Sequence, residues 1–266
     1  MSTKLHHTLI VVALTAALAA CATSPLGRRQ LVLVSNAEVN QAGIASFQDM
    51  QKKLPQSKDN RQVGYVNCVA GAIVNEIPRL QAQGKLRVPA NWEVSVFESK
   101  DVNAFALPGG KIGVYTGLLK IAATQDQLAA VIGHEVSHVL AGHSAERYSE
   151  TMASQVGGVL VQATTGVNGD LVNMATQAFI LLPFSRAHES EADLLGLDLM
   201  ASAGFDPRQA IALWQNMARA GGGKPPEFMS SHPSDETRIR NLSERLNTAM
   251  PIYEQARSAG RQPRCS

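Results

Sequence analysis

The sequence has little net charge, few cysteines and, beyond its N-terminus, no long apolar run. Its 24 Lys and Arg residues nearly balance its 22 Asp and Glu residues, which leaves a formal charge of +2 over 266 residues. A nucleic-acid-binding surface needs a concentrated excess of basic side chains, so this balance excludes nucleic acid as a partner. A disordered chain is excluded too, because 45% of the residues are hydrophobic and only 17% are charged. We therefore expect a folded domain with a full hydrophobic core.

No stretch of the chain is apolar over the length of a membrane span, which takes about 20 residues. The best candidate, 156–182, is interrupted by polar residues, which are Gln162, Asn168, Asp170, Asn173 and Gln177. We expect this segment to form helices on either side of a Gly-Asp turn and to act as a mobile cover over a cleft.

The N-terminus has the features of a signal peptide. Lys4 and two His residues precede an apolar run, 9–20, that is too short to span a bilayer comfortably. The small residues before Cys21 resemble a bacterial lipobox, after which Cys21 would carry lipid and become the first mature residue. Ala22 in the next position resembles lipoproteins sorted to the outer membrane. The alternative is a plain secretory signal followed by an incidental cysteine.

If Cys21 carries lipid, only Cys68 and Cys265 remain. An oxidising compartment would permit a disulfide that joins the C-terminal tail to the body of the protein. A buried free Cys68 and a loose Cys265 are the alternative. The sequence leaves both open.

What the chain does contain is a metal-binding pattern, H-E-x-x-H, at positions 134–138. On a helix, His134 and His138 lie one turn apart on the same face, where both can bind one Zn2+ with Glu135 beside it. The surrounding apolar residues predict a core helix over 124–149. Burying these polar groups without partners would be costly, so a metal is the simplest explanation. Ordinary hydrogen bonds between the His residues are the alternative.

A catalytic zinc needs a third protein ligand and an open position for water. The metzincin pattern would put that ligand at position 144, which is Ser144, and this excludes a metzincin. His143 lies one residue short of it and is expected on the helix surface or behind a ligand. Glu189 and Asp193 are one turn apart in a predicted helix, so one can bind the metal while the other orients a ligating His.

Two apolar strands are predicted within 103–119, because Pro-Gly-Gly separates two apolar runs. This segment is either a plain hairpin or an edge strand beside the metal. In the second case an extended peptide substrate would add to the sheet as another strand. The residues that would bind it are Asn103, Ala104, Phe105 and Ala106.

Together these motifs resemble the HtpX-type and CAAX-prenyl-protease-type family of gluzincin peptidases. The resemblance covers about 94–246, with the N-A-F-A-L-P-G-G hairpin, H-E-x-x-H and E-x-x-x-D in the family's order. It implies that Glu135 is the general base and that Asp193 orients one of the zinc ligands. Glu191 competes for the place of the third ligand, but the four-residue gap to Asp193 favours Glu189. The implied ligands of one Zn2+ per chain are His134, His138 and Glu189.

The resemblance extends to the segment 231–238. In soluble members of the family the same His-Pro and the following Arg lie near the active site. His232 would then be a removable fourth ligand or would stabilise the oxyanion, with Arg238 nearby. The alternative is a loop His that precedes a helix capped by Ser234.

The ligand set implies a mechanism, the lipobox implies a location, and the family suggests a role in quality control. Zn2+ lowers the pKa of water, and Glu135 takes the proton and passes it to the leaving amine. The chain would be a zinc endopeptidase of the bacterial periplasm, held at the outer membrane by its lipid. Its expected substrates are unfolded or misassembled envelope proteins, and other envelope assembly or protease factors are expected partners. The rival is a zinc-containing chaperone or assembly factor with little proteolysis, held closed by His232.

The expected fold class is α+β, mainly α-helical, with a small β-sheet beside the active-site helix. Apolar spacing predicts further helices over 35–54, 62–83 and 206–220 and a half-buried strand over 92–98. The expected organisation is a lipoprotein signal peptide at 1–20, a lipid-anchored tether at 21–34, a metallopeptidase domain at 35–250 and a C-terminal tail at 251–266.

Overall fold

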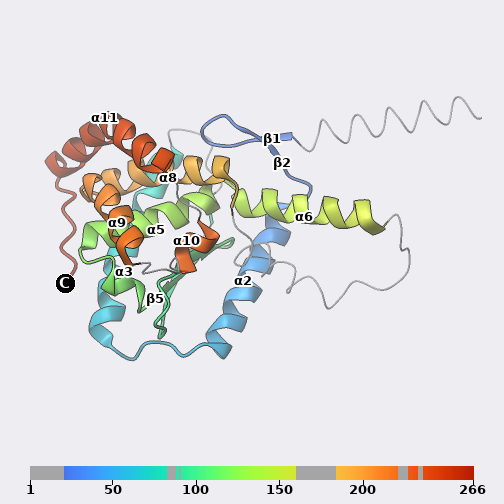
Figure 1. Ribbon diagram of the computed structural model, residues 1–266, viewed down its shortest axis with the longest axis horizontal. Coiled ribbons are helices and arrows are strands. Elements are labelled where there is room, and N and C mark those ends of the chain that lie inside the picture. Colours follow the sequence, from blue (N-terminus) through green and yellow to red (C-terminus); the bar gives the residue numbers. More distant parts are fainter. Residues whose placement is uncertain (1–20, 83–87, 90, 160–183, 221–226, 233–235) are drawn as a thin grey trace, which may run out of the picture.

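Helices and two small sheets make up the structure, a computed structural model shown in Figure 1. The expected mainly helical α+β class is confirmed. Among the helices that the structure describes, none is both long and apolar enough to cross a membrane. The described residues are 21–82, 88–89, 91–159, 184–220, 227–232 and 236–266.

The helix with the H-E-x-x-H pattern, α5 (Gln125–Leu140), lies in the middle of the fold. All its residues from position 127 onward are buried. Three helices pack around it, which are α3 (Asn60–Asn75), α8 (Arg186–Ser202) and α9 (Arg208–Ala220). Because the polar residues of α5 are buried with the apolar ones, each of them needs a partner inside the protein.

Two glycines let α5 and α8 approach backbone to backbone. A Cβ atom on Gly133 would lie 2.9 Å from the carbonyl oxygen of Gly196, and a Cβ atom on Gly196 would lie 2.8 Å from the His134 nitrogen. Such distances leave no room for a side chain at either position. The close contact brings the acidic residues of α8 within reach of the imidazoles of α5.

A three-stranded sheet lies against α5. Its strands are β3 (Glu93–Phe97), β4 (Ala104–Leu107) and β5 (Lys111–Tyr115), in the order β3-β5-β4. β4 and β5 are antiparallel and form the predicted hairpin, whose turn contains Gly109 and Gly110 at positive φ. β4 is therefore an edge strand of this sheet, and it packs against α5.

The predicted helix over 124–149 is two helices. α5 ends at Leu140, and α6 (His143–Val159) begins after Gly142, which has φ +73°. A glycine in this left-handed conformation commonly ends a helix, because its N–H can bond back to the last turn. Here the Gly142 N–H donates to the Val139 carbonyl. The break turns the chain, so His143 does not continue the helix face that carries His138.

The other predicted helices have close counterparts. α2 (Asn36–Lys53) begins with a capping box between Ser35 and Glu38. The helix expected over 62–83 ends at Asn75, and Pro78 stands in the first turn of the short helix α4 (Ile77–Gln81). A single-turn 3-10 helix, η1 (Leu118–Lys120), follows β5, and α10 (Glu227–Ser231) follows α9 along the chain.

The segment expected as a tether, 21–34, is folded against the body of the protein. β1 (Cys21–Thr23) and β2 (Arg29–Leu31) pair as an antiparallel hairpin, with Gly27 at φ +90° in its turn. In Figure 1 this N-terminal hairpin lies beside α6, and β2 contacts that helix. The polar composition suggested a tether, but the partners of these polar residues lie more than a hundred positions away in the sequence.

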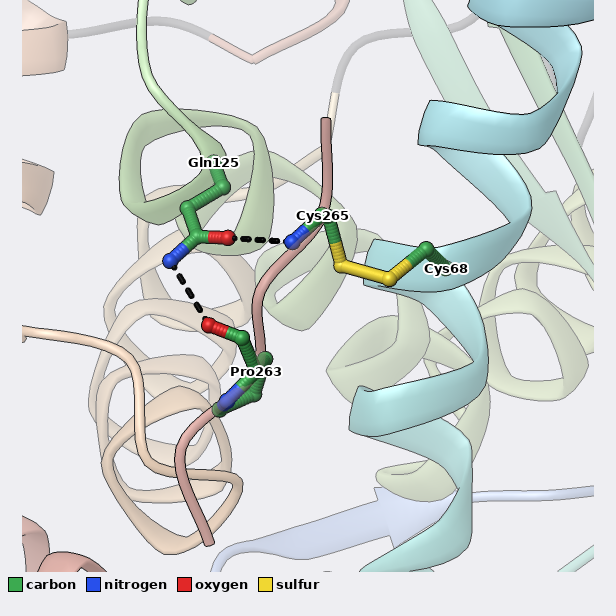
Figure 2. The surroundings of a disulfide bond; sticks show 4 residues. All are labelled: Cys68, Gln125, Pro263 and Cys265. Carbon is green, nitrogen blue, oxygen red and sulfur yellow. Dashed lines mark hydrogen bonds between the residues drawn. A yellow bond between two sulfur atoms is a disulfide. The ribbon is translucent and has the colours of Figure 1, made fainter.

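The C-terminal region is also folded. The predicted boundary at residue 250 falls inside α11 (Glu236–Ser258), which packs on α8 and α9. Of the two possibilities for the cysteines, the structure contains the disulfide between Cys68 of α3 and Cys265 (Figure 2). The Gln125 side chain accepts a hydrogen bond from the Cys265 N–H and donates one to the Pro263 carbonyl. The last residues of the chain are thereby held against α3 and α5.

Candidate metal centre

Four buried side chains from different parts of the chain meet at one point. His134 and His138 come from α5, Glu189 comes from the first turn of α8, and His232 follows α10. Each offers one nitrogen or oxygen atom, and these atoms all lie within 4.8 Å of one another. The structure thus brings together the three ligands expected from the sequence and the proposed fourth one.

The spacing of the donor atoms fits a cation. His134 Nε2 and His138 Nε2 are 3.1 Å apart, and the Glu189 carboxylate oxygens lie 3.5 Å and 3.4 Å from them. Each imidazole has a partner at its other nitrogen, so both Nε2 lone pairs can point to the same place. The lone pairs on these two nitrogens and the negative charge of the Glu189 carboxylate repel one another unless a cation lies between them. Nitrogen and carboxylate donors in this number are typical of a divalent transition metal.

Asp193 holds His134 from behind, as the i, i+4 spacing from Glu189 suggested. Its Oδ1 atom is 2.9 Å from His134 Nδ1. The Arg238 guanidinium donates to Asp193 Oδ1 at 2.7 Å and to Glu189 Oε2 at 2.8 Å. It also lies 3.5 Å from the centre of the Trp214 ring. Arg238 therefore orients both acids, one facing the donor cluster and one behind it.

Glu135 lies on the same side of α5 as the cluster. Its Oε2 atom accepts a hydrogen bond from the Ala106 N–H of β4 at 3.3 Å. Its Oε1 atom accepts no hydrogen bond from a described residue, although His232 Nε2 is 3.3 Å away. Burial raises the pKa of the Glu135 carboxyl above its ordinary value. Such a carboxyl group is suited to accepting and returning a proton near neutral pH.

The burial of the cluster sets the charge of its members. Burial lowers the pKa of His138 well below its ordinary value, which favours the neutral form that binds a cation. Burial also disfavours a charged Glu189, but His232, His134 and His138 hold its pKa well below the ordinary value. Burial and Arg238 lower the pKa of His134, yet Asp193 and Glu189 raise it to about 9. A bound cation would therefore displace a proton from His134.

The predicted substrate-binding strand lies beside the cluster. Ala104 and Ala106 pack in the same core as α5, whereas the Phe105 ring packs away from it against Phe47 and Phe97. Asn103 is buried just before the strand. Among the described residues β4 pairs with β5 on one side only, and on its other side the buried strand faces α5, where the Ala106 N–H donates to Glu135 Oε2.

Some expectations from the sequence differ from the structure or lie outside it. Glu191, the competing third ligand, turns away from the cluster towards His143 and Arg28. Of the two places expected for His143, on the helix surface or behind a ligand, the structure has the second, because this residue is fully buried behind His138. The cap proposed for Ser234 and most of the predicted cover, 160–182, lie outside the described residues. Sequence reasoning did not find Arg28, because a local pattern carries no sign of partners so distant in the chain.

The comparison with known proteins agrees with this geometry. A family model described as "Peptidase family M48" matches residues 70–246. The mitochondrial metalloendopeptidase OMA1 of Schizosaccharomyces pombe is 44% identical over 160 residues, which are 59% of this chain and 48% of the relative. The metalloprotease LoiP of Escherichia coli is 27% identical over 223 residues, 82% of this chain and 84% of LoiP. The metalloprotease YcaL of the same organism is 29% identical over 162 residues, 59% of this chain and 63% of YcaL. The chain spans about half the length of the yeast OMA1 relatives.

Proposed function

The chain belongs to peptidase family M48, and on that premise we propose that it is a zinc-dependent endopeptidase. The observation that carries the proposal is the meeting of His134, His138 and Glu189, with Glu135 beside them. The sequence motifs predicted a metallopeptidase, and the family match confirms that prediction. The finer resemblance, to HtpX-type and CAAX-type peptidases, stays a prediction.

The residues of the site have complementary tasks in peptide hydrolysis. His134, His138 and Glu189 would hold zinc, which supplies a Lewis acid that polarises a carbonyl group and acidifies water. Glu135 takes a proton at Oε1, the atom without a hydrogen bond from a described residue, and delivers it to the leaving amine. An extended peptide that adds beside β4, the edge strand, would lie next to Glu135, because the Ala106 N–H of this strand already contacts Glu135 Oε2.

The test of the proposal separates metal binding from catalysis. Metal analysis of the purified protein should find one zinc per chain, and a chelator should abolish cleavage of casein. Glu135→Gln should abolish cleavage while zinc stays bound, because the amide cannot accept the proton. Glu254→Gln, an exposed position on α11, is the matched control and should cleave as the wild type does. Cleavage by the Glu135→Gln protein would overturn the assignment of the base.

We further propose that the protein works in the bacterial envelope, held at the outer membrane by a lipid on Cys21, and degrades misfolded envelope proteins. The Cys68–Cys265 disulfide supports an oxidising compartment. The relation to two proteases of Escherichia coli supports a bacterial role, although the OMA1 relatives are mitochondrial by name. Labelling with a fatty-acid analogue should mark the wild type and not Cys21→Ala, and only the wild type should fractionate with outer membranes. An unlabelled wild type would contradict the lipid anchor.

One observation favours the rival function, a chaperone or assembly factor with little proteolysis. His232 Nδ1 lies 2.9 Å from Glu189 and its Nε2 lies 3.3 Å from Glu135, so this imidazole occupies space that a substrate would need. His232→Ala separates the two functions. A factor with little proteolysis that is held closed by His232 should cleave casein faster in this variant, whereas an endopeptidase in which His232 stabilises the oxyanion should cleave casein more slowly than the wild type.

A further inference from the structure

The second imidazole of the metal-binding pattern is backed by another imidazole. His138 Nδ1 is 2.9 Å from His143 Nδ1, at the start of α6. On its far side, His143 Nε2 is 3.1 Å from Glu191 Oε2, on α8. All three side chains are buried. A chain of hydrogen bonds thus runs away from the metal centre, from α5 through α6 to α8.

The carboxylate at the end of this chain determines where the protons are. Glu191 only accepts hydrogen bonds, so the proton of a neutral His143 is on Nε2 and its Nδ1 is an acceptor. His138 must then carry its proton on Nδ1, and its Nε2 lone pair faces the metal centre. The tautomer of His138 that can bind a cation is therefore set by Glu191, two hydrogen bonds away.

Glu191 is in turn held by the N-terminal hairpin. Arg28 Nε donates to Glu191 Oε2 at 3.0 Å, and the Leu26 N–H donates to Oε1 at 3.4 Å. The two other Arg28 nitrogens form a forked pair with Glu146 of α6, at 2.7 Å and 2.6 Å. Gln30 donates to the Ala141 carbonyl, just past the end of α5, at 2.8 Å. The hairpin thus contacts α6, α8 and the residue that follows the end of α5.

Arg28 gives this arrangement its charge balance. Glu191 and Glu146 are buried acids on neighbouring helices, and the guanidinium lies between them. Without it, Glu191 would lose the donor that holds Oε2 near His143 and would turn towards solvent, since a buried carboxylate that loses its cation is strongly disfavoured. His143 would then lose its acceptor, and the proton on His138 would no longer be directed to Nδ1.

We propose that Arg28 is a positioning residue of the metal centre: through Glu191 and His143 it fixes the orientation and tautomer of His138. The inference rests on the proposed function in taking His138 as a zinc ligand. Arg28 lies outside the residues 70–246 that match the peptidase family. The N-terminal hairpin therefore completes a site whose ligands all come from later in the chain.

The experiment measures zinc affinity by competition with a chromophoric chelator. Arg28→Gln should weaken zinc binding by up to about tenfold, the low end of the range found when the support of a metal ligand is removed. Arg29→Gln, the exposed neighbour on β2, is the matched control and should bind zinc as the wild type does. Arg28→Lys keeps the positive charge but not the paired guanidinium hydrogen bonds, and it should lose less zinc affinity than Arg28→Gln. The absorption spectrum of the cobalt-substituted protein should change in Arg28→Gln and not in Arg29→Gln.

A double-variant cycle with His143→Gln distinguishes positioning from a general loss of structure. If Arg28 acts through His143, the double variant should bind zinc no more weakly than the weaker single variant. Losses that multiply, or an Arg28→Gln protein with the affinity of Arg29→Gln, would overturn the positioning role and leave the proposed function standing. A wild-type chain that binds no zinc would remove the proposed function and this inference together.

Discussion

The two imidazoles of the H-E-x-x-H pattern are held from behind in different ways. Behind His134 stands a carboxylate, Asp193, oriented by Arg238, so the support is one hydrogen bond long and lies within α8 and α11. Behind His138 stands His143, and only after it come Glu191 and Arg28. In both cases a carboxylate, Asp193 or Glu191, sets the tautomer of the imidazole. Only the longer series of hydrogen bonds, behind His138, depends on the N-terminal hairpin. The two halves of one metal site thus depend on different regions of the chain.

The largest effect is expected at the short support. Asp193→Ala should weaken zinc binding by about 100-fold, because it removes the acceptor of His134 directly. It should also lower the free energy of unfolding of the metal-free protein by about 3–5 kcal/mol, since Arg238 is left as a buried charge without this acid. Competition with a chelator measures the zinc affinity, and urea unfolding measures the free energy of unfolding. Zinc affinity within twofold of the wild type would show that Asp193 does not support a ligand.

A smaller effect is expected at the first member of the long support. His143→Leu should weaken zinc binding by about tenfold, because His138 Nδ1 loses its acceptor but its ring stays packed. His143→Asn should recover part of the loss, since the amide oxygen can stand in for the acceptor nitrogen. Equal affinities for the Leu and Asn variants would indicate a role in packing alone. The ratio of the Asp193→Ala and His143→Leu losses measures how unequal the two supports are.

The ion pair between Arg28 of the N-terminal hairpin and Glu146 should make the stability of the fold depend on pH. Burial disfavours the charged form of Glu146, yet its hydrogen bonds to His188 and Arg28 lower its pKa to about 2 from an ordinary 4.5. A lowered pKa in the folded state contributes stability that is present above 4.5 and is lost as the pH falls towards 2. The urea midpoint of the wild type should fall through this window, and that of Glu146→Gln should fall less. Parallel curves for the two proteins would contradict the assignment.

The smallest effect on zinc is expected at the C-terminus, which is remote from both supports. Cys265→Ser removes the disulfide to Cys68 and should lower the free energy of unfolding by about 2–5 kcal/mol. Zinc affinity of the folded protein should not change, because neither imidazole contacts this region. A tenfold loss of zinc affinity in Cys265→Ser would mean that general stability, not the local supports, governs metal binding.

Much of the site could be predicted from the sequence, because its strongest signals are local. His134 and His138 share a helix face through their i, i+4 spacing, and the same spacing relates Glu189 to Asp193 on α8. The hairpin of β4 and β5 was predictable from Pro-Gly-Gly between apolar strands. The break between α5 and α6 was missed, since apolar and helix-forming residues continue past Gly142.

The sequence by itself determined the donor groups that can hold a metal and the helices that carry them, because helix periodicity is a property of neighbouring residues. Asp193 as a support and His232 as a fourth donor were also predicted, but only the tertiary structure decided that Asp193 stands behind His134 and that His143, Glu191 and Arg28 stand behind His138. The partners of those contacts are far apart along the chain, with 118 positions between Arg28 and Glu146 and 98 between His134 and His232. Such pairings depend on how the helices pack in space, and no pattern of nearby residues records them.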